Sequence, residues 1–77
     1  MNNQSLGQKR VKAEFNPAKN DVVDQIKNKS AELIDLIETM RGDGKAMISG
    51  EKARVISIAQ TEVETACMYA VKACFTS

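Results

Sequence analysis

The C-terminal third of the chain most limits what it can fold into, because it contains neither glycine nor proline from Glu51 to Ala73. A segment without these two helix breakers can form one long helix. Apolar residues recur along it with alternating spacings of three and four, which indicates a helix face that packs against a partner. These residues are Ile56, Ala59, Val63, Ala66, Ala70 and Ala73. Because most of them are alanine, a partner helix can approach closely.

A second helix is expected over residues 17–41. Asn16 is a suitable N-cap, and Pro17 suits the first helical position, where its missing N–H costs no hydrogen bond. Arg41 followed by Gly42 is typical of a helix end. The apolar residues of this segment also follow helical spacing, and they are Val23, Ile26, Leu33, Ile34, Ile37 and Met40.

Together these segments predict an all-α fold, a two-helix antiparallel hairpin with an N-terminal arm, in a single domain over 1–77. The arm is 1–16, the loop is 42–50 with Ser49 as the N-cap of the next helix, and the second helix is 51–75. Val55, Cys67, Val71 and Cys74 widen the apolar surface of that helix beyond what one partner helix covers. With only three aromatic residues to fill a core, we expect the chain to assemble into a compact helical homo-oligomer.

Composition and charge exclude several classes of protein. A hydrophobic fraction of 43% is too high for a disordered chain, and no apolar run approaches the roughly 20 residues of a membrane span. The polar N-terminus predicts no secretory signal. A net charge of +1 is too small for a dedicated binder of duplex DNA.

The residues that usually carry catalysis are scarce. The chain has no histidine, which removes the commonest general base and the commonest metal ligand. It also has no glycine-rich phosphate loop, CxxC pair or nucleophile elbow. Cys67 and Cys74 are about two helical turns apart, too far for a disulfide within one chain, so they are expected to be reduced. We therefore expect a binding protein and not an enzyme, with no metal site and no cofactor.

The arm carries the strongest candidate binding residues. Arg10, Lys12 and Lys19 flank Phe15 and Asn16, which places an aromatic face and an amide among cations. This combination suits a nucleotide, with the base stacked on the ring and the phosphate held by the cations. The alternative is that Phe15 and Asn16 only anchor the arm, as a hydrophobic staple and a helix cap.

The two helices add four further candidate cations: Lys27, Lys29, Arg54 and Lys72. Lys72 lies within an apolar stretch, so its ammonium can extend from a helix bundle or meet a ligand where subunits join. For Lys27 and Lys29 ordinary surface charge remains the alternative. Thr61, Thr65 and Tyr69 place hydroxyl groups one turn apart along one side of the second helix.

Three segments also resemble a known family: RVKAEFNP (10–17), VVDQIKNKSAELIDLI (22–37) and IAQTEVETACMYAVKA (58–73). Their order and spacing, over about residues 7–75, are similar to the small phage proteins with the helical-hairpin domain of anti-CBASS and anti-Thoeris sponges. The resemblance is closer to the short anti-CBASS type. It implies a homo-oligomer, typically a hexamer, that sequesters cyclic dinucleotides, such as cyclic GMP–AMP, and cyclic trinucleotides without degrading them. The expected place of action is the cytoplasm of the bacterial host.

The resemblance also implies which residues bind the ligand in pockets between protomers. Phe15 corresponds to the stacking aromatic, Lys27 to a lysine of the first helix and Lys72 to a basic position late in the second. Arg10 and Asn16 belong to the same arm motif. The arm has Phe15 where short members of the family have tyrosine, so a hydrogen bond from that phenol is lost.

Two other functions remain open at this stage. A helical module that blocks or scaffolds a host protein explains the wide apolar surface equally well, but it gives no reason for the Phe15–Asn16 pair among cations. A small binder of single-stranded nucleic acid would use the basic arm and would bind with a strong dependence on salt.

Overall fold

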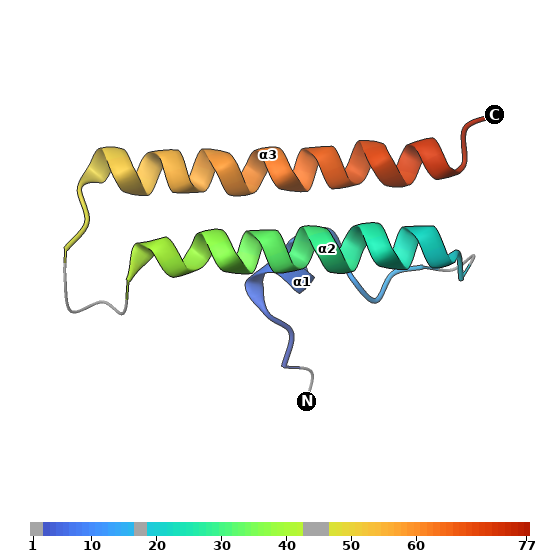
Figure 1. The fold of residues 1–77 in the computed structure, drawn as a ribbon, viewed down its shortest axis with the longest axis horizontal. Coiled ribbons are helices and arrows are strands. Elements are labelled where there is room, and N and C mark those ends of the chain that lie inside the picture. The colour runs from blue at the N-terminus through green and yellow to red at the C-terminus, as the bar shows by residue number, and fades with distance from the viewer. Residues whose placement is uncertain (1–2, 17–18, 43–46) are drawn as a thin grey trace.

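The computed structural model describes residues 3–16, 19–42 and 47–77. It is all-helical within these ranges: α1 (Leu6–Val11), α2 (Asp21–Glu38), a single 3-10 turn η1 (Thr39–Arg41) and α3 (Gly50–Cys74). Figure 1 shows α2 and α3 running antiparallel side by side, with the short α1 crossing behind the middle of α2. The predicted all-α fold with an antiparallel hairpin is therefore confirmed.

The short helix α1 was not expected, because the arm was predicted only as a basic segment over 1–16. Ser5 and Gln8 form a capping box: Ser5 Oγ accepts from the Gln8 N–H at 3.1 Å, and Gln8 Oε1 accepts from the Ser5 N–H at 2.8 Å. The helix ends at Lys12, which has a left-handed backbone (φ 53°). This capping box at the start of α1 stabilises a helix of only 6 residues.

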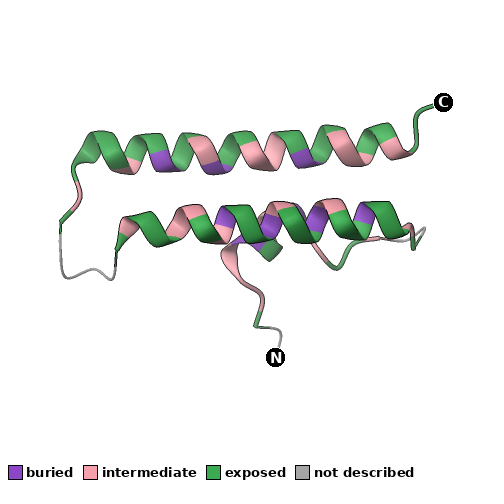
Figure 2. Cartoon of the chain, viewed as in Figure 1, coloured by how far each residue is buried: buried purple, intermediate pink, exposed green. Residues whose placement is uncertain are grey.

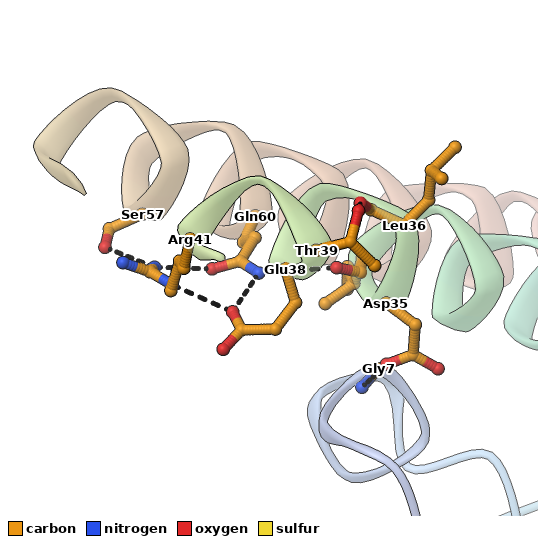
Figure 3. Close-up of polar contacts among 9 residues, drawn as sticks. Gly7, Asp35, Leu36, Glu38, Thr39, Arg41, Ser57 and Gln60 are labelled. Carbon is orange, nitrogen blue, oxygen red and sulfur yellow. Dashed lines mark hydrogen bonds and ion pairs between the residues drawn. The ribbon is translucent and has the colours of Figure 1, made fainter. Parts of the chain in front are cut away.

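Gly7 allows α1 to lie directly on α2. A Cβ at this position would stand 2.0 Å from the carbonyl oxygen of Ala31, so only glycine fits the approach. The Gly7 N–H donates to Asp35 Oδ1 at 2.7 Å (Figure 3), which satisfies a free donor of the first turn of α1. The arm is thus part of the folded structure and not a solvated tail.

The predicted start of the first long helix was wrong. Asn20, not Asn16, is the N-cap of α2, and its Oδ1 accepts from the N–H groups of Val22 and Val23 at 2.9 and 3.2 Å. Lys19 has a left-handed backbone (φ 51°), which stops a helix from running through it. Asn16 instead stabilises this cap: its amide donates to the Asn20 carbonyl at 2.9 Å and to Asp24 Oδ1 at 2.8 Å. Pro17, expected at the first helical position, lies outside the described residues.

The two ends of the loop are capped as the sequence predicted. Gly42 follows η1 with a left-handed backbone (φ 81°) that ends the helical segment. Ser49 is the N-cap of α3, and its Oγ accepts from the Lys52 N–H at 3.0 Å. Helix α3 lies one residue earlier at each end than the predicted range 51–75.

The core is narrow. Val11, Ala31, Ile34 and Cys67 form its buried cluster, and the structure is only 14 Å thick along its shortest axis. Figure 2 shows buried residues spaced along the inner sides of α2 and α3, with exposed residues on both outer faces. The residues of α3 that face α2 are Ile56, Gln60, Val63 and Cys67. Of these, only Ile56 and Val63 belong to the predicted row.

Several residues therefore differ from the predicted burial pattern. Ala66 and Ala73 of the alanine row are exposed, and Gln60 is fully buried. Lys27, expected off the apolar row, is 5% exposed, whereas Leu33 is 44% exposed. The large apolar side chains left exposed on the hairpin are Val22, Leu33, Leu36, Met40, Val55, Ile58, Met68, Tyr69 and Phe75. No helix among the described residues is long and apolar enough to cross a membrane.

Gln60 is satisfied by a polar network at the loop end of the hairpin (Figure 3). Its Nε2 donates to the Ile34 carbonyl at 3.3 Å and to Glu38 Oε1 at 2.8 Å. Arg41 donates to Gln60 Oε1 at 3.0 Å and to Glu38 Oε1 at 2.9 Å. The hydrogen bond from the Gln60 amide, followed by that from the Arg41 guanidinium, lowers the pKa of Glu38 below its ordinary value.

The network is expected to make stability depend on pH through Glu38. A carboxyl whose pKa is lower in the folded state stabilises the fold above its unfolded pKa, and this contribution is lost as the pH falls through the folded pKa. Urea unfolding at about pH 6 and about pH 3 should therefore show that Glu38→Gln destabilises less at the lower pH. An effect of Glu38→Gln that is the same at both pH values would contradict this assignment.

Candidate functional site

A pocket of about 450 Å³ lies between the end of α1, Lys27 in the N-terminal half of α2, and α3 from Thr61 to Val71. Its volume is within the range of small-molecule binding sites. Three cations and one carboxylate line it, which leaves a formal charge of +2, and the rest of the lining is apolar or carries hydroxyl groups. The lining residues are Arg10, Val11, Lys12, Lys27, Thr61, Glu64, Thr65, Cys67, Met68 and Val71.

Lys27 joins the arm to α2. Its Nζ donates to the backbone carbonyl of Lys12 at 3.0 Å and also to the carbonyl of Phe15. The same ammonium lies 5.4 Å from the centroid of the Phe15 ring, a cation–π distance. An ammonium has three N–H groups, so after these two hydrogen bonds one donor remains for a ligand. Burial of this lysine is thus compensated by the backbone of the segment that it holds.

Arg10 and Glu64 connect the arm to α3 across the pocket. Arg10 Nη1 donates to Glu64 Oε1 at 3.2 Å, and the two side chains are 34% and 42% exposed. One turn of α3 supplies further polar groups, since Thr65 Oγ1 donates to the Thr61 carbonyl at 3.0 Å. Because its proton is used in this way, the Thr65 hydroxyl presents lone pairs, not a donor, to whatever enters the pocket.

Phe15 lies beside this pocket and borders a neighbouring, more open hollow with Gln4, Lys9, Lys12 and Glu14. Phe15 is 66% exposed, which argues against close packing as a hydrophobic staple, and the Lys27 ammonium lies over its ring. Lys12 borders both hollows. An aromatic face held in place by a cation, and otherwise open to solvent, can stack on a planar ring.

The other candidate residues are spread over the molecule. Asn16 is half-buried and serves the cap of α2, and Lys29 is exposed on α2. Lys72 is exposed near the end of α3, next in sequence to Val71 of the pocket. Arg54 lies near the opposite end of α3, where Glu51 accepts from it at 2.7 Å and raises the pKa of its guanidinium. The structure thus brings Arg10 and Lys27 together with Phe15 beside them, and it leaves Arg54 apart.

Glu64 was missed as a site residue, and Thr61 and Thr65 were noted only as hydroxyl groups. The signal was available, because Thr61, Glu64, Thr65 and Met68 follow helical spacing and so share one face of α3. What the sequence lacked was the position of α1, which places Arg10 and Lys12 opposite that face. Among the described residues, no three His, Cys, Asp or Glu side chains are grouped to hold a metal ion.

A small helical hairpin with a pocket of cations, hydroxyl groups and apolar side chains has the composition of a binding domain for small anionic molecules. The chain belongs to the Acb2/Tad1 hairpin-domain family, whose model matches residues 7–75. This match confirms the resemblance to anti-CBASS and anti-Thoeris sponges, a family of binding domains known for binding cyclic nucleotides. Comparisons with curated proteins and with solved structures found no match.

Proposed function

We propose that this chain is a phage-encoded sponge that binds cyclic dinucleotides and cyclic trinucleotides without cleaving them, and so inhibits CBASS immunity in the cytoplasm of the bacterial host. The observation that carries the proposal is the pocket in which Arg10, Lys12 and Lys27 converge beside the exposed Phe15 ring. A cyclic dinucleotide has two phosphodiester charges and two flat bases. The formal charge of +2 matches the phosphates, and the ring and apolar lining match the bases.

Oligomerisation is part of the proposal. The structure is 14 Å thick and leaves Leu36, Met68, Tyr69 and Phe75 about 60% exposed, more apolar surface than a stable monomer usually presents. Association of several copies, a hexamer by the family resemblance, would cover these side chains. It would also enclose a pocket that is open to solvent in one chain, because Met68 both lines the pocket and is exposed.

Calorimetry with a panel of cyclic di- and trinucleotides tests the proposal. We expect at least one to bind with a Kd below about 10 μM, roughly −7 kcal/mol. Phe15→Ala should weaken that binding about 10-fold or more, because stacking on an aromatic ring contributes about 1–3 kcal/mol per base. The same variant should leave the free energy of unfolding nearly unchanged, since the ring is largely exposed.

Two results would contradict the proposal. One is the absence of binding to every cyclic nucleotide of the panel. The other is the recovery of only linear products after the complex is digested with protease, which would indicate a nuclease. Full affinity in Phe15→Ala would remove this residue from the site and leave the sponge function standing.

The alternative is a helical module that blocks or scaffolds a host protein, and the exposed apolar side chains of α2 and α3 favour it. The two functions differ in their dependence on the arm. Phe15→Ala should leave a protein partner bound through the helices, whereas it should weaken a nucleotide complex.

A further inference from the structure

We infer that the Arg10–Glu64 ion pair reads the base of the ligand and selects guanine. The inference rests on the proposed function and adds to it the identity of the preferred nucleotide. Glu64 places a carboxylate in a pocket that, on the proposed function, must accept phosphates. A carboxylate repels phosphate, so its natural partner in a nucleotide is a group of N–H donors on a base.

The pair presents hydrogen-bonding groups in a defined order. Arg10 Nη1 donates to Glu64 Oε1 at 3.2 Å, which holds the guanidinium and the carboxylate side by side. A ligand that approaches their common edge meets an N–H donor of Arg10 followed by the acceptor oxygens of Glu64. The order is donor, acceptor, acceptor.

Guanine is the base whose Watson–Crick edge complements this order. Its edge presents an acceptor (O6) followed by two donors (N1–H and N2–H). Adenine presents a donor followed by an acceptor, cytosine a donor followed by two acceptors, and uracil an acceptor, a donor and an acceptor. Cytosine and uracil would each place at least one donor against a donor or one acceptor against an acceptor. Adenine, even when turned over, pairs only with the Arg10 donor and one Glu64 oxygen, and it leaves the other oxygen without a donor. Guanine alone satisfies all three groups, and unpaired polar groups in a site are strongly selected against.

The neighbouring residues of α3 agree with this assignment. The Thr65 hydroxyl gives its proton to the Thr61 carbonyl at 3.0 Å, so beside Glu64 it adds another acceptor for N–H groups. The side chains of Cys67 and Met68 supply an apolar surface for the plane of the base. With Arg10 and Glu64 neutralising each other, Lys12 and Lys27 remain as two positive charges for two phosphates.

The experiment is calorimetric titration of the full chain with cyclic di-GMP and cyclic di-AMP. We expect wild-type protein to bind cyclic di-GMP about tenfold to a hundredfold more tightly. Glu64→Gln should reduce this ratio to near one, because an amide presents one donor and one acceptor and can pair with adenine as well. Glu62→Gln, an exposed glutamate of the same helix outside the pocket, is the matched control and should keep the wild-type ratio.

Thr65→Val provides a second and independent variant. It removes the added acceptor with little change in shape and should lower the ratio severalfold, whereas Thr65→Ser should retain it. Equal binding of the two ligands by wild-type protein, or a preference that persists in Glu64→Gln, would overturn the inference and leave the sponge function intact. If no cyclic nucleotide binds at all, the proposed function and this inference fall together.

Discussion

Replacing Lys27 by methionine is expected to lower the free energy of unfolding by about 2 kcal/mol, because it leaves the carbonyl groups of Lys12 and Phe15 without their donor. Methionine keeps the volume of the buried stem, so the change tests the ammonium and not the packing. Urea unfolding measures the loss. Hydrogen exchange should locate it by faster exchange of the amides from Lys12 to Phe15 than in wild-type protein.

Lys29→Met is the matched control for this variant. Lys29 lies on the same helix, carries the same charge and is exposed, so its replacement should change stability by less than about 0.5 kcal/mol. If the two variants were equally stable, the Lys27 ammonium would not hold the arm. If the sponge function is correct, Lys27→Met should also weaken cyclic-nucleotide binding by more than tenfold, since it removes a charge and loosens the segment with Phe15.

Gly7→Ala is expected to destabilise the protein by about 3 kcal/mol, a large effect for the addition of one methyl group. The new Cβ would stand 2.0 Å from the Ala31 oxygen and 2.7 Å from its carbonyl carbon, and backbone atoms cannot move aside as a flexible side chain can. Helix α1 must then separate from α2, with loss of the hydrogen bond from the Gly7 N–H to Asp35. Thermal unfolding followed by circular dichroism measures the change.

Gly50→Ala serves as the control for the second variant. A Cβ at Gly50 meets no atom within 4 Å, and the position is the first residue of α3, where alanine is a better helix former than glycine. Its stability should therefore equal or slightly exceed that of wild-type protein. An equally stable Gly7→Ala protein would show that α1 can dock on α2 in another way.

The hairpin could be predicted from the sequence because it depends on local signals. Helical spacing, the Ser49 cap and the position of Gly42 all act within a few residues. Burial was less predictable, since a side chain is buried by what lies across from it. Surface charge was an open alternative for Lys27 because its acceptors belong to a segment 12 to 15 residues away. Burial of Gln60 was not predicted, because it depends on Glu38 and Arg41, which lie beside it only in the folded chain.

The same contrast between local signals and long-range contacts applies to the candidate site. Arg10 and Phe15 were found because cations around an aromatic residue form a chemical pattern within the sequence, and Lys27 was found through the family resemblance. Glu64 becomes meaningful only with Arg10 opposite it. The N-cap expected at Asn16 is instead Asn20, because the left-handed backbone of Lys19 prevents the helix from extending further toward the N-terminus. A backbone conformation of this kind leaves little trace in residue type when the residue is lysine.

The buried amide of Gln60 has a consequence for how such a protein can diversify. Gln60 bonds to the Ile34 carbonyl and to Glu38, and sliding α3 along α2 by one turn would leave these groups unpaired in the interior. The longitudinal alignment of the two helices is therefore fixed by residues that do not line the pocket. Side chains at positions 61, 64 and 65 can then be exchanged without loss of alignment, so the choice of ligand can evolve separately from the scaffold that presents it.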